Sequence, residues 1–98
     1  MNTQLVEAVR SHSILSFRYE DLLRTVEPHL YGIHAETNNE ILSAYQIGGS
    51  SHSGSQPGWR YFVVSEIGDL KLTGEAFGST RSGYNRHDPR LKIVFARA

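Results

Sequence analysis

Residues 13–28 read SILSFRYEDLLRTVEP, and this stretch is the strongest indication of the fold in the chain. Up to Tyr19, large apolar side chains recur with a period of two, which is typical of a β-strand with one buried face. The Glu20-Asp21 pair predicts a tight turn, and residues 22–27 alternate again as a second strand. Pro28 has no amide hydrogen to donate, so we expect it to stop or bend that strand at a sheet edge.

The residues before this stretch predict one short α-helix over 3–11. Asn2 and Thr3 are good helix caps, and apolar side chains then recur at helical spacing at Leu5, Ala8 and Val9. A helix of this length is marginal alone, so we expect this apolar face to rest on a sheet.

Further extended segments follow on the C-terminal side, at residues 29–34, 40–47, 59–64 and 70–73, with a turn at 37–39 and with Leu70 and Leu72 facing inward. Five short strands behind one helix predict a mainly β fold, in which a small, bent antiparallel sheet closes into a five-stranded barrel. We expect a single domain with the helix in residues 1–12, the barrel in 13–74 and a C-terminal extension in 75–98.

The C-terminal extension contains LKIVF at residues 91–95, an apolar set too large to leave exposed on a chain of 98 residues. We expect it to pair with a barrel edge, either in its own chain or in a neighbouring copy, which would make a homo-oligomer. Arg81, Tyr84 and Asn85 would then lie at the rim, where they could complete a ligand site.

Composition narrows the class of protein. Lys and Arg number 10 and Asp and Glu number 10, which argues against a protein that coats DNA but leaves room for a local basic face. The chain has no Cys, no signal-peptide pattern and no run of about 18 apolar residues. We therefore expect a cytoplasmic protein that does not enter a membrane.

The familiar catalytic and metal-binding patterns are missing from the sequence. Gly49 and Gly54 have P-loop spacing, but Ser55-Gln56 replaces the required Lys-Ser/Thr pair. The five histidines show neither the spacing nor the carboxylate partners of a zinc site. We predict no enzyme, no cofactor and no metal. The Gly/Ser-rich loop over 48–58 is either a plain connector or a functional loop.

Arginine and aromatic residues form the candidate site, since guanidinium groups bind phosphates and rings stack on bases. The competing reading is that the rings fill the core, which we expect for Phe17, Phe62 and Trp59 and leave open for Tyr45 and Tyr84. We expect Ser51, His52 and Ser53 to lie over one barrel mouth. The predicted ligand-binding residues are Arg24, His29, Tyr31, Tyr45, Ser51, His52, Ser53, Arg60, Arg81 and Tyr84.

Four segments in order resemble the WYL domain family. They are ILSFRY at 14–19, RTVEP at 24–28, EILSAY at 40–45 and RYF at 60–62 with a following Ile67. The triplet that names the family stands here as Glu40-Ile41-Leu42, and two positions that are usually basic are Val63 and Glu66. The resemblance therefore implies an anion site that is weakened or relocated relative to the family.

The resemblance also implies a fold and a function. The fold would be an Sm-like, SH3-type five-stranded barrel after an N-terminal helix, in a bacterial protein. The function would be a non-enzymatic, regulatory, ligand-sensing domain for a phosphate-bearing ligand, either a nucleotide or single-stranded nucleic acid. The family is linked to transcription regulation and to CRISPR-associated systems, which suggests a regulator protein as a partner. The alternative is a protein-interaction or oligomerisation module without a small ligand.

Overall fold

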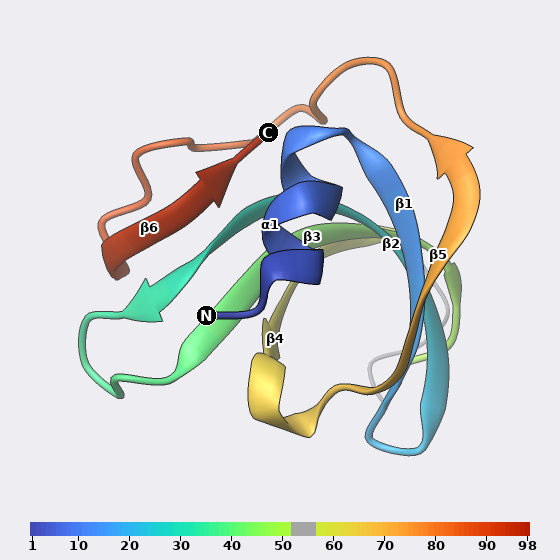
Figure 1. The fold of residues 1–98 in the computed structure, drawn as a ribbon, viewed down its shortest axis with the longest axis horizontal. Coiled ribbons are helices and arrows are strands. Elements are labelled where there is room, and N and C mark those ends of the chain that lie inside the picture. Colours follow the sequence, from blue (N-terminus) through green and yellow to red (C-terminus); the bar gives the residue numbers. More distant parts are fainter. Residues whose placement is uncertain (52–56) are drawn as a thin grey trace.

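The structure is a computed structural model that describes residues 1–51 and 57–98. One short helix and six strands make a mainly β fold in these residues (Figure 1). The elements are α1 (Thr3–Arg10), β1 (Ser13–Tyr19), β2 (Leu22–His34), β3 (Glu40–Gly49), β4 (Gly58–Val63), a 3-10 turn (Val64–Glu66), β5 (Gly68–Ala76) and β6 (Leu91–Arg97).

The strands form one open antiparallel sheet. Its order is β4-β3-β2-β1-β5, and β6 pairs with β2 outside this path. Figure 1 shows the sheet strongly curved, with α1 lying inside the curve. The helix buries four residues against the sheet: Leu5, Val6, Ala8 and Val9. Asn2 caps it, because its Oδ1 accepts a hydrogen bond from the Leu5 amide at 3.1 Å.

The predicted hairpin is confirmed. Tyr19 pairs with Leu22 across a two-residue turn at Glu20 and Asp21, whose φ angles are 55° and 62°. Positive φ at both central residues is the type I′ arrangement, whose twist matches that of the flanking strands.

The prediction for Pro28 is half right. Pairing changes here, but β2 continues as one strand to His34. Pairing with β1 reaches Val26, pairing with β6 begins at Leu30, and the register with β3 shifts between Pro28 and Leu30. Pro28 therefore lies where β2 exchanges one neighbour for another, at a bulge that does not need its missing amide hydrogen.

The C-terminal strand pairs within its own chain. Residues Leu91–Arg97 run antiparallel to the second half of β2, from Leu30↔Arg97 to His34↔Leu91. Of the two arrangements expected for the apolar set at 91–95, the intramolecular one is therefore present.

The core lies between α1 and the inner face of the sheet. Phe17 and Phe62 are buried as predicted and meet edge to face with ring centroids 4.9 Å apart. Two inward predictions are wrong. Leu72 is 48% exposed, on the edge strand β5, where eight of nine residues are exposed. Trp59 is only half-buried and lies outside the core, since its face of β4 is turned toward the C-terminal segment.

The close contact between β2 and β6 makes a testable prediction at Gly32. A Cβ atom there would lie 2.1 Å from the Ile93 backbone oxygen and 2.8 Å from a Leu91 methyl group. Gly32→Ala should therefore lower the free energy of unfolding by about 1–3 kcal/mol in urea titration. Gly68→Ala is the matched control, because nothing lies within 4 Å of its Cβ position. Equal stability of the two variants would contradict this packing.

Candidate functional site

The predicted ligand-binding residues separate into two groups. Arg24, Ser51 and Arg60 line one cavity of about 230 Å³, which we call the arginine cavity. His29, Tyr45 and Tyr84 pack around Trp59 instead, and Arg81 lies over the Tyr45 ring. His52 and Ser53 lie outside the described residues. The prediction that Ser51, His52 and Ser53 lie over a barrel mouth therefore falls mostly outside them as well.

Arg24 is the most deeply buried charged residue of the arginine cavity, at 2% exposure. Its two Nη atoms donate to Gln46 Oε1 at 3.3 Å, to the Tyr19 carbonyl at 3.2 Å and to Glu20 Oε1 at 3.2 Å. Its Nε has no hydrogen-bond partner among the described residues. A buried guanidinium that keeps one donor unused retains the capacity to bind another acceptor.

The other walls of the arginine cavity come from β1 and β4. The Arg24 guanidinium lies over the rings of Tyr19 and Phe62, at 5.6 Å and 5.8 Å from their centroids. Arg60 donates from Nη1 to the Trp59 carbonyl at 3.0 Å. The ion-pair partner of Arg24 is Glu20, in the turn that precedes β2.

Glu27 pairs with Arg81 from the C-terminal segment. Arg81 donates from Nε at 2.7 Å and from Nη2 at 3.1 Å to the two oxygens of this buried carboxylate. The guanidinium also lies 4.7 Å from the centroid of the Tyr45 ring. Its bond to Glu27 raises the pKa of Arg81. Both Nε and Nη2 of Arg81 are therefore already used to hold residues 77–84 against β2.

His29 fastens the same segment from within the fold. It is fully buried, its Nδ1 donates to the Glu27 carbonyl at 2.8 Å, and its Nε2 accepts from the Arg81 amide at 3.1 Å. These partners require the neutral ring, because Nε2 must accept. Phe77 stacks on His29 with ring centroids 5.0 Å apart. Burial lowers the pKa of His29 below 6.5.

Tyr31 lies apart from both groups. It is fully buried, and its hydroxyl donates to Glu40 and accepts from the Asn2 amide at 2.7 Å. Burial and the Glu40 carboxylate raise its pKa to about 12. Tyr31 ties the start of α1 to β3, with its hydroxyl bonded on both sides.

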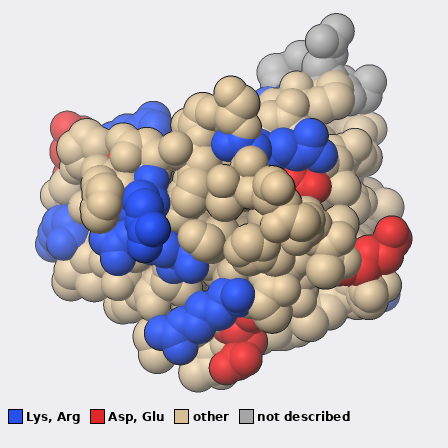
Figure 2. Space-filling model, turned by 90° about the horizontal axis from the view of Figure 1, so that it is seen from above, with Lys and Arg blue, Asp and Glu red and all other residues tan. Residues whose placement is uncertain are grey.

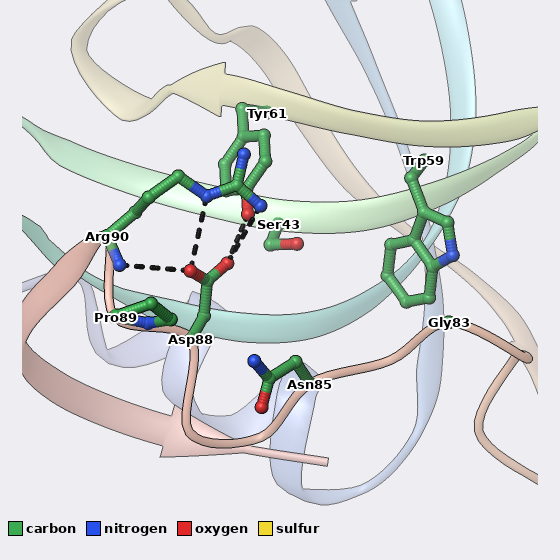
Figure 3. A pocket seen from close by; sticks show the side chains of 8 residues that line it. All are labelled: Ser43, Trp59, Tyr61, Gly83, Asn85, Asp88, Pro89 and Arg90. Carbon is green, nitrogen blue, oxygen red and sulfur yellow. Dashed lines mark hydrogen bonds and ion pairs between the residues drawn. The ribbon is translucent and has the colours of Figure 1, made fainter.

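A second cavity, of about 510 Å³, lies between β4 and the C-terminal segment (Figure 3). We call it the tryptophan cavity. Its lining residues are Ser43, Trp59, Tyr61, Gly83, Asn85, Asp88, Pro89 and Arg90. Asn85 was expected at a rim, but Asp88 and Arg90 were not predicted as site residues. No sequence spacing indicates that residues 88 and 90 meet residue 61.

Asp88 is the centre of a hydrogen-bond network in this cavity. It is 6% exposed, accepts from the Tyr61 hydroxyl, and accepts from the Arg90 Nε at 3.2 Å and Nη2 at 3.1 Å. Burial alone would raise the Asp88 pKa, but the bonds from Arg90 and Tyr61 outweigh it and hold that pKa low. Burial and the bond to Asp88 raise the pKa of Tyr61 to about 12. Asp88 is therefore a charged structural group with its two oxygens occupied.

Cations gather near the tryptophan cavity. Residues 81–97 contain five of the ten Lys and Arg residues and a single carboxylate, that of Asp88. Figure 2 shows several of the Lys and Arg side chains together on the side of the molecule that carries β6. Although the net charge of the chain is zero, its C-terminal segment is basic. This segment supplies the local basic face that the composition allowed.

No protein-family model, curated protein or solved structure matches the chain. Within residues 1–51 and 57–98, His, Asp and Glu side chains form no group of three or more that could hold a metal ion. In the same residues, no helix has both the length and the apolar character that crossing a membrane requires.

The buried neutral ring of His29 predicts a pH-dependent stability. Its pKa is lowered in the folded state, so the unfolded chain takes up the proton first as the pH falls below about 6.5. Stability should be complete above pH 6.5 and should fall below it, by at most about 1.4 kcal/mol per pH unit. Urea titrations between pH 7.5 and 5.5 measure this slope.

His29→Gln should flatten the slope, whereas His87→Gln, at an exposed position, should keep it. An NMR titration of wild-type His29 gives a second readout that does not depend on the variant folding. A pKa at or above 6.5 would contradict the burial argument.

Proposed function

We propose that the chain is a non-enzymatic, ligand-sensing domain that binds a phosphate-bearing ligand in the arginine cavity. One observation carries this proposal: Arg24 is 2% exposed, lines a cavity together with Arg60, and has an Nε without a partner among the described residues. A buried charge is costly unless it is paired, so a site that keeps such a donor is suited to an anion.

The charges around the cavity support an anionic ligand. Two guanidinium groups and one carboxylate, that of Glu20, line it. Glu20 is about half exposed, so solvent screens its share of the pairing with Arg24. Guanidinium groups form charge-assisted hydrogen bonds to phosphate oxygens, and two arginines at one cavity can donate to the same phosphate. Nucleotides and single-stranded nucleic acids both present such oxygens.

A regulatory WYL-type domain with an Sm-like, SH3-type barrel remains part of this proposal. The five-strand path β4-β3-β2-β1-β5 and the helix before β1 support it, since a strongly curved sheet in this order brings its two end strands toward each other. A role beside a transcription regulator or a CRISPR-associated system in the cytoplasm belongs to the same proposal. Asp88 and His29, whose polar atoms are occupied by structural bonds, favour a binding role over catalysis.

An interaction or oligomerisation module is the second candidate, and β5 favours it. This strand pairs only with β1 among the described residues, and it leaves eight of its nine residues exposed, Leu72 among them. An edge strand of this kind is a template for pairing with another chain. Light scattering coupled to size exclusion distinguishes the candidates, because this module requires a dimer or larger assembly that Leu72→Lys disrupts.

The phosphate proposal predicts opposite effects at two neighbouring positions. Tripolyphosphate should raise the melting temperature of the wild type, because it binds the native state alone. Arg60→Gln should weaken its binding by about 10-fold to 100-fold, the equivalent of roughly 1.5–3 kcal/mol for a charged hydrogen bond. Glu20→Gln should strengthen binding, because it removes the carboxylate that competes for Arg24.

Arg18→Gln is the matched control, since Arg18 is an exposed cation of β1 whose ion pair with Asp69 lies outside the cavity. Arg24→Gln should act like Arg60→Gln, provided that circular dichroism shows an intact fold. Binding should also weaken as salt rises. Equal losses in Arg18→Gln and Arg60→Gln would show diffuse charge attraction and contradict a site in the arginine cavity.

A further inference from the structure

We infer that the tryptophan cavity is a second binding site, for an uncharged planar ring that carries a carbonyl oxygen, such as a pyrimidine base. This inference goes beyond the phosphate binding proposed above, because the cavity shares only Tyr61 with the arginine cavity and has a different charge. Its volume, about 510 Å³, lies within the range of roughly 300–1,000 Å³ that small-molecule sites occupy.

Flat groups stand on opposite sides of this cavity. Trp59 and Tyr61 are two residues apart on β4, so their side chains project from the same face of the sheet. The Arg90 guanidinium lies 4.1 Å from the centroid of the Tyr61 ring, and Figure 3 shows Trp59 across the cavity from this stack. Indole rings and guanidinium planes both stack on heteroaromatic rings.

Trp59 is held in place without a ligand. Its Nε1 donates to the Ser82 carbonyl at 2.9 Å. His29 and Tyr45 meet its ring edge to face, with centroids 4.8 Å and 5.6 Å away. A side chain that is already fixed costs little conformational entropy on binding, so the cavity is preorganised to accept a ring.

The charge of the cavity favours a neutral ligand. The Asp88 carboxylate and the Arg90 guanidinium cancel one another, and the Tyr61 hydroxyl adds a further bond to the carboxylate. Because Asp88 and Arg90 are paired with each other, neither of them attracts a charged ligand strongly. This distinguishes the tryptophan cavity from the arginine cavity, where cations are in excess.

Asn85 supplies the polar specificity. Its Oδ1 accepts from the His87 amide at 3.0 Å, which fixes which way the side-chain amide points. Figure 3 shows the Asn85 nitrogen turned toward Asp88, at the border of the cavity. Both oxygens of Asp88 are already bonded, so the Asn85 NH₂ group remains as a donor for a ligand carbonyl.

Tryptophan fluorescence tests this inference directly, because Trp59 is the single tryptophan of the chain. Uridine, which has no phosphate, should quench it in a saturable manner. Dihydrouridine keeps the carbonyl groups but has a puckered ring, so it should bind at least about fivefold more weakly if stacking contributes. No saturable response to millimolar uridine, or equal binding of the two nucleosides, would overturn the inference.

Asn85→Asp tests the donor. Aspartate can still accept from the His87 amide, but it cannot donate to a carbonyl, so uridine affinity should fall about tenfold. Asn39→Asp makes the same change at an exposed position and should leave the affinity unchanged. Wild-type affinity in Asn85→Asp would overturn the assignment. Because uridine lacks phosphate and tripolyphosphate lacks a ring, failure at either cavity is distinguishable from failure at the other.

Discussion

The arrangement of the tryptophan cavity depends on the change of neighbour in the middle of β2. Around Pro28 the strand has left β1 and has not yet reached β6, and here Glu27 and His29 turn to the C-terminal segment instead. Both side chains are buried, so leaving them without partners would be costly. Arg81 satisfies both, with its guanidinium on Glu27 and its amide on His29. A bulge in one strand thereby fixes the path of residues distant in sequence.

That path places the walls of the tryptophan cavity. Residues 83–90 continue from the Arg81 anchor and cross the outer end of β4, where Trp59 donates to the Ser82 carbonyl. The Asp88 network then fastens the far end of the segment to Tyr61 before β6 begins. The cavity is bounded by two polar anchors with a loop between them. Such an arrangement combines fixed walls with an exposed rim, as a small-ligand site requires.

Local patterns were sufficient to predict the mainly β class, the short helix and the first hairpin. Alternation in residues 13–28 and the paired turn at Glu20 and Asp21 depend on neighbours in sequence, and the hairpin follows from them. The candidate site was only partly predictable. Arg24 and Arg60 were predicted because guanidinium groups bind phosphates and both residues lie on predicted strands. Asp88 and Arg90 were missed because their roles depend on a contact with Tyr61, 27 residues away from Asp88, that no local pattern encodes.

Trp59 shows why burial is harder to predict than strand position. A tryptophan on a strongly β-prone segment usually packs inward, and its alternation partner Tyr61 gives no contrary signal. The side chain faces outward here because the inner face of β4 is taken by Phe62, and the C-terminal segment then covers the outer face incompletely. Half the cations of the chain lie in that segment, around a cavity that is itself neutral. The cations therefore make the surroundings of the cavity basic without making the cavity itself an anion site.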